Sequence, residues 1–144
     1  MTTTSAPTTS TTTTTQLTRG ALGGLAGGVV FGMLMQMMGM IPMVAQLVGS
    51  GSAVVGWVVH LAISAAIGAS YAVLLGSRPS SRIAGVGYGM GYGVLWWVVG
   101  ALVAMPARLG MPVFQINSTS LQSLMGHLIF GAILGVVVAS GRRA

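Results

Sequence analysis

The sequence contains no aspartate, glutamate, cysteine or lysine, and its six arginines account for all of the 4% of residues that are charged. Without carboxylates the chain has no acidic general base, no carboxylate nucleophile and no hard ligand for calcium or magnesium. Without thiols and lysine amines it has no thiolate and no Schiff base, and a Ser-His-Asp triad cannot be completed. These absences predict that the protein is not an enzyme.

Apolar residues are abundant and make up 53% of the 144 residues. A chain of this kind has too little polar surface to cover a water-soluble globule. Four stretches without a charged residue reach the roughly 20 residues that a helical membrane crossing needs. They are residues 20–41, 53–75, 83–105 and 120–140. The sequence therefore predicts an all-α membrane protein in which residues 19–144 form a four-transmembrane-helix bundle surrounded by the lipid bilayer.

The arginines lie at the ends of these stretches and predict the orientation of the bundle. Five of them, Arg19, Arg78, Arg82, Arg142 and Arg143, fall on one side, whereas Arg108 falls on the other. By the positive-inside rule both termini lie in the cytoplasm, so the topology is N-in and C-in, and we expect the inner, cytoplasmic membrane of a prokaryote. The arginines form no continuous stripe with aromatic residues between them, so nucleic acid is not an expected partner.

Residues 1–18 are dominated by threonine and serine. A segment so polar and so uniform cannot bury a core, and it has no apolar stretch before a cleavage site such as a secretory signal requires. We predict a disordered cytoplasmic tail.

The sequence pattern of residues 19–144 predicts an internal duplication of a two-helix unit. Moving the sequence by 64 positions aligns Gly23 with Gly87, Gly27 with Gly91 and Pro42 with Pro106. Moving it by 67 positions aligns His60 with His127 and Gly68 with Gly135. An even number of crossings per unit makes the two units parallel, so the pattern predicts two parallel helical hairpins related by an axis along the membrane normal.

Glycines spaced four residues apart line one face of the first and third predicted helices. They are Gly20, Gly24, Gly28 and Gly32, followed by Gly85, Gly89 and Gly93. In lipid, helices associate through close van der Waals contact, which such faces permit. We expect helices one and three to pack together, with the rings of Tyr88 and Tyr92 in the groove at Gly24 and Gly28. The same faces could also serve a homo-oligomer.

His60 and His127 are ionisable side chains inside the predicted spans, at matched depth in helices two and four. Intramembrane ionisable residues are costly, so they are candidate functional residues. Three interpretations are open: hydrogen bonding to a neighbouring hydroxyl or carbonyl, ligation of haem b or of a metal such as copper, and a path for protons or a small solute. The second would make His60 and His127 cofactor-binding residues, and the third would make the protein a small-solute channel or transporter.

Other residues within the spans have simpler interpretations. Five methionines between Met33 and Met40 are soft enough to bind Cu(I), but they spread around the helix, which favours packing. Gln36 is expected to bond to a neighbouring helix. Trp96 and Trp97 lie at about the depth of the histidines, where they either pack or form the wall of a pocket.

Three segments carry a resemblance to a known group of proteins: GMLMQMMGMIPM (32–43), MPARLGMP (105–112) and SLMGHLIFG (123–131). They resemble a family of small, functionally uncharacterised bacterial four-helix integral membrane proteins. The resemblance implies the four-span architecture and no activity. From the sequence we expect a non-enzymatic membrane protein with a structural or interaction role; the cofactor-binding and transport interpretations remain as alternatives.

Overall fold

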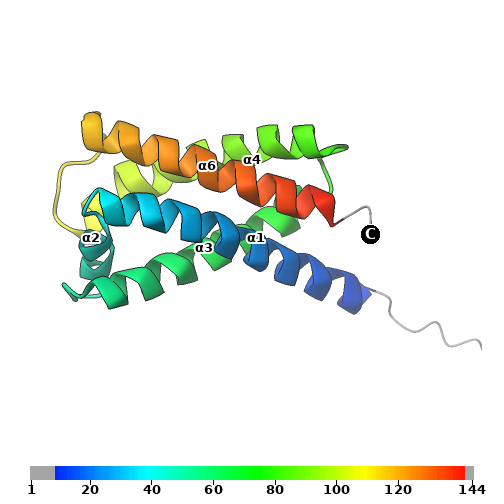
Figure 1. Ribbon diagram of the computed structural model, residues 1–144, viewed down its shortest axis with the longest axis horizontal. Coiled ribbons are helices and arrows are strands. Elements are labelled where there is room, and N and C mark those ends of the chain that lie inside the picture. Colours follow the sequence, from blue (N-terminus) through cyan, green and yellow to red (C-terminus); the bar gives the residue numbers. More distant parts are fainter. Residues whose placement is uncertain (1–8, 142–144) are drawn as a thin grey trace, which may run out of the picture.

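The computed structural model describes residues 9–141, and every regular element in that range is helical (Figure 1). The elements are α1 (Thr9–Met37), α2 (Ile41–Gln46), α3 (Ala53–Leu75), α4 (Arg82–Trp96), the π-helix η1 (Trp97–Ala104), α5 (Met105–Arg108) and α6 (Ser118–Ser140). The predicted all-α class is therefore confirmed.

Four helices are long and apolar enough to cross a membrane: Thr13–Met37, Ala53–Leu75, Arg82–Arg108 and Ser118–Ser140. They match the four predicted stretches and indicate a multi-pass membrane protein. The third is composite, because α4, η1 and α5 follow one another without a break. The first ends at Met37 rather than at residue 41, because Gly39 adopts a φ of 69° that a right-handed helix cannot contain, and α2 starts immediately afterwards with a proline in its first turn.

The prediction for residues 1–18 is wrong over the described part, residues 9–18, which belong to α1. Residues 1–8 lie outside the described residues. Threonine hydroxyls can bond to the carbonyl one turn back, as Thr18 Oγ1 does to Thr14 O at 3.0 Å. Helix α1 thus begins with a polar segment, residues 9–18, and continues past Arg19 into the apolar span.

The four long helices pack in the spatial order α3, α1, α6, α4. Helix α1 lies against both α3 and α6, and α4 lies against α6, whereas α3 and α4 scarcely meet. The chain alternates direction, so both described ends and the α3–α4 connection lie at the same end of the bundle (Figure 1). The first and third predicted spans, which correspond to α1 and α4, were expected to pack together. This prediction is wrong, because α1 pairs with α3 and α4 pairs with α6, so each long helix packs on the next or previous long helix in the sequence.

Within the first hairpin, the glycine face of α1 lies directly on α3. A Cβ atom at Gly20 would overlap Gly68, one at Gly24 or Gly28 would overlap Ser64, and one at Gly32 would overlap the ring of Trp57. At Gly20 and Gly24 the nearest partners are backbone atoms, which cannot move aside without moving the helix, whereas at Gly28 and Gly32 they are side-chain atoms of Ser64 and Trp57. These glycines therefore set the closeness of the first hairpin, and the tyrosines of α4 do not enter this contact.

Within the second hairpin, α4 lies on α6 in the same way. A Cβ at Gly85 would meet Gly135, one at Gly89 would meet Gly131, and one at Gly93 would meet the backbone of His127. Gly23 and Gly27 also face a neighbour, but Gly87 and Gly91 have no atom within 4 Å of an added Cβ. The packing positions of α1 and α4 are therefore 65 residues apart, and the 64-residue alignment of Gly23 with Gly87 does not describe equivalent contacts.

The core lies where the two hairpins meet. Its largest fully buried side chains are Tyr71, Ile41 and Leu134, and Phe31, Met35 and Phe130 are also buried there. The Tyr92 ring reaches α3, with its centroid 5.2 Å from that of Tyr71 and its hydroxyl 2.8 Å from the hydroxyl of Ser70.

Candidate functional site

A cavity of about 650 Å³ lies between the two hairpins. It exists because α1 and α6 close one side of the bundle while α3 and the composite third span stay apart on the other. Side chains from all four spans and from α2 line it. Most of this lining is apolar, which together with the size is typical of a site for a small molecule.

The π-helix forms one wall of the cavity. In η1 the backbone N–H of Met105 bonds to Gly100 O, five residues back. Gly100, Ala101, Leu102 and Ala104 from this segment line the cavity, and an added Cβ at Gly100 would have no atom within 4 Å. π-helices are rare and are often found at functional sites.

The loop after α5 covers the end of the cavity that is distal to the chain termini. Phe114 donates its backbone N–H to Leu102 O at 2.8 Å, which fixes the loop to η1. The φ of Phe114 is 55°, a left-handed conformation that is unusual for a bulky residue and tends to occur at functional sites. Arg108 and Gln115 supply polar groups at this end.

His60 lines the cavity from α3 and is buried. Its Nε2 lies 2.9 Å from Gly28 O of α1. Since a carbonyl oxygen can only accept, Nε2 carries the proton. The close approach at Gly28 allows this bond, which is the interhelical hydrogen bond to a carbonyl foreseen from the sequence.

His127 lines the cavity from α6 and is half-buried. Its Nδ1 lies 2.8 Å from Ser123 O, one turn back in the same helix, so Nδ1 is the protonated nitrogen. The Ser123 hydroxyl lies 3.4 Å from the same nitrogen. Thus the two histidines are brought to one cavity, but they are held by different kinds of contact.

Phe31 separates the two histidines. Its ring centroid is 5.5 Å from that of His60 and 4.7 Å from that of His127, and α1 packs between the helices that carry them. Haem ligated by both histidines needs its iron and porphyrin between the rings. The residues present do not fit haem in that way. No group of three or more histidine, cysteine, aspartate or glutamate residues that could hold a metal ion occurs within residues 9–141.

The methionines and tryptophans divide between the cavity and the outer surface. Met35 lines the cavity, whereas Met33 and Met37 are exposed, so the 33–40 segment does spread around the helix. Trp96 lines the cavity, and its buried indole N–H has no hydrogen-bond partner in the described chain. Trp97 donates to Ser120 O at 2.8 Å.

Gln36 makes the expected bond to a neighbouring helix. Its Oε1 accepts from Trp57 Nε1 at 3.1 Å, joining α1 to α3. Neither residue lines the cavity, so this bond is not part of the candidate site.

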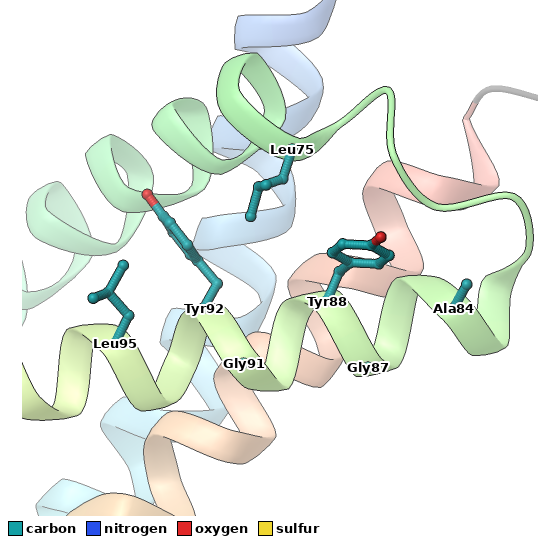
Figure 2. A pocket seen from close by; sticks show the side chains of 7 residues that line it. All are labelled: Leu75, Ala84, Gly87, Tyr88, Gly91, Tyr92 and Leu95. Carbon is teal, nitrogen blue, oxygen red and sulfur yellow. The ribbon is translucent and has the colours of Figure 1, made fainter.

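A second, shallower groove lies between the last turn of α3 and α4. In Figure 2, Tyr88 and Tyr92 project from α4 on the side of Leu75; Gly91 lies between them along the helix, and Gly87 precedes Tyr88. Tyr88 is exposed. This groove contains neither histidine and has few polar groups, so the cavity is the stronger candidate.

No protein-family model, curated protein or solved structure matches the chain. The site is therefore interpreted from its own geometry.

Proposed function

We propose that this protein is a non-enzymatic, multi-pass protein of the prokaryotic cytoplasmic membrane that binds a lipophilic small molecule between its two hairpins. This is an interaction role, carried by one observation: the apolar cavity of about 650 Å³ to which all four spans contribute. Sites for small molecules commonly have volumes of about 300 to 1,000 Å³, apolar walls and a few convergent polar groups.

The outer surface supports the membrane part of the proposal. Large apolar side chains point away from the bundle, among them Ile83 at 86% and Val54 at 73% exposure. Water would penalise such a surface, whereas lipid would not. The Arg19 side chain lies beside Gly141, which follows α6, and Arg78 lies in the α3–α4 connection. This end of the bundle carries both described chain ends (Figure 1), which supports the N-in and C-in orientation.

The matched packing of the two hairpins supports an internal duplication. In each hairpin the first helix presents glycines at a spacing of four, and a histidine on the second helix contacts the third of them: His60 donates to Gly28 O, and the backbone of His127 lies beside Gly93. We propose that both hairpins use the same glycine-zipper packing. Self-association of the bundle through a remaining apolar face stays a prediction.

The experiment fills the cavity without disturbing the helix packing. Gly100 lines the cavity and has open space at its Cβ position, so Gly100→Phe should occupy the site. Gly87→Phe is the matched control, because Gly87 also has open space but lies in the other groove. Protein purified in detergent is extracted with organic solvent and analysed by mass spectrometry.

Wild type and Gly87→Phe should release the same lipophilic compound in near-stoichiometric amount, and Gly100→Phe should release little of it. An equal yield of that compound from Gly100→Phe and Gly87→Phe would contradict binding in the cavity.

A further inference from the structure

The hydrogen bonds of the two histidines fix which of their ring nitrogens are free. Gly28 O holds the proton on Nε2 of His60, and Ser123 O holds the proton on Nδ1 of His127. In a neutral imidazole the remaining nitrogen is an acceptor. Tautomer exchange cannot turn it into a donor without breaking the bond to the carbonyl.

Both imidazoles are expected to be neutral in this setting. The whole chain contains no aspartate or glutamate that could compensate an imidazolium charge, and an uncompensated charge inside an apolar bundle is costly. His60 and His127 therefore present two acceptors, Nδ1 and Nε2 respectively.

These acceptors are accessible although their residues are largely enclosed. Neither nitrogen has a hydrogen-bond partner in the described chain. The side-chain polar atoms there that lack both a partner and accessible surface are Tyr71 Oη and Trp96 Nε1, and the two histidine nitrogens are not among them. The free histidine nitrogens thus retain accessible surface, and the cavity is the space that both residues line.

We propose that the molecule held in the cavity is a hydroxyl-bearing lipophile, a phenol or alcohol with a hydrocarbon body, whose O–H donates to a free imidazole nitrogen. The inference rests on the proposed function and names its ligand class. A hydroxyl group carries the donor that each free imidazole nitrogen lacks. A ketone or ether lacks the donor, and an ionised carboxylate or phosphate likewise has no proton to donate to either imidazole nitrogen.

A pair of probes that differ in one donor tests this inference. Para-octylphenol and its methyl ether are titrated into wild-type protein in nanodiscs by calorimetry, with empty nanodiscs as the blank. The phenol should bind roughly ten-fold more tightly, as expected for one hydrogen bond to a group otherwise left unpaired. The double variant His60→Phe/His127→Phe should bind both probes with similar affinity, and Gly100→Phe should bind neither.

The outcomes separate the two proposals. Equal affinity of wild type for both probes, with both lost in Gly100→Phe, would overturn the hydroxyl inference and leave the cavity-binding proposal standing. Absence of binding by wild type, or binding that Gly100→Phe does not weaken, would contradict the cavity-binding proposal itself. Should the double variant fail to fold, the wild-type ratio and Gly100→Phe still decide between these outcomes.

Discussion

At the scale of single residues, glycine determines how closely the helices approach. Gly89 and Gly87 are two positions apart on α4, yet a Cβ at Gly89 would overlap the carbonyl of Gly131, whereas a Cβ at Gly87 meets nothing within 4 Å. In lipid the closeness of such contacts replaces the hydrophobic driving force that acts in water. The two positions therefore allow a direct test.

We predict that Gly89→Leu destabilises the protein and that Gly87→Leu does not. Forcing a larger side chain into a packed contact typically costs about 1 to 3 kcal/mol. The measurement is thermal unfolding in detergent followed by circular dichroism, in which Gly89→Leu should unfold at a clearly lower temperature. Equal midpoints for the two variants would refute the assigned contact face.

Some of the site residues could be predicted from the sequence and others could not. His60 and His127 stand out because a polar group in lipid needs a partner, and each has one here. Trp96, expected either to pack or to form the wall of a pocket, does line the cavity, whereas Phe31 carries no signal in the sequence. In a span where nearly every residue is apolar, composition does not tell which face lines a cavity and which faces lipid.

At the scale of elements, length and hydropathy located the four spans because the bilayer imposes a minimum length on each. The π-helix η1 was not foreseen, since it depends on how the third span packs rather than on its composition. The glycine faces were recognised, but they indicate only that a close contact exists. They do not identify the partner, and neither does the length of the connection: residues 76–81 join α3 to α4, which scarcely meet, whereas α1 lies on α3 and α4 on α6 across longer connections.

The contact between the two hairpins can be tested by cross-linking. A Cβ at Gly23 of α1 would lie 3.3 Å from the Cβ of Val137 of α6, close to the roughly 3.5 to 4.5 Å found in disulfides. Because the chain contains no cysteine, the pair Gly23→Cys/Val137→Cys would be the only thiols. It should form an intramolecular disulfide on mild oxidation, visible as a mobility shift in gel electrophoresis.

The pair Gly87→Cys/Val137→Cys is the matched control, because Gly87 has no neighbour within 4 Å of an added Cβ. Cross-linking of this control pair in preference to the first would show that α1 and α6 are not neighbours in the bundle.

At the scale of the whole molecule, two closely packed hairpins meet through α1 and α6 and leave a cavity on the other side. The glycine contacts of α1 with α3 and of α4 with α6 lie within each hairpin, and Gly23, Gly27 and Gly126 make the close contacts between α1 and α6. The space between α3 and the third span can therefore accommodate a ligand without breaking either set. The histidines, Phe31, Trp96 and η1 meet there although they come from four different spans. This convergence is a property of the assembled bundle and is not visible in any one segment.

Photolabelling tests the central claim, that the cavity holds a lipophile, most directly. A para-alkylphenol carrying a diazirine on its chain is irradiated with wild-type protein in nanodiscs, and the modified residues are mapped by peptide mass spectrometry. Labels should concentrate on cavity residues such as Met35, Ile63 and Ala101, and excess unlabelled para-octylphenol should suppress them. Labels confined to lipid-facing residues such as Ile83 and Val54, and unaffected by the competitor, would contradict the account.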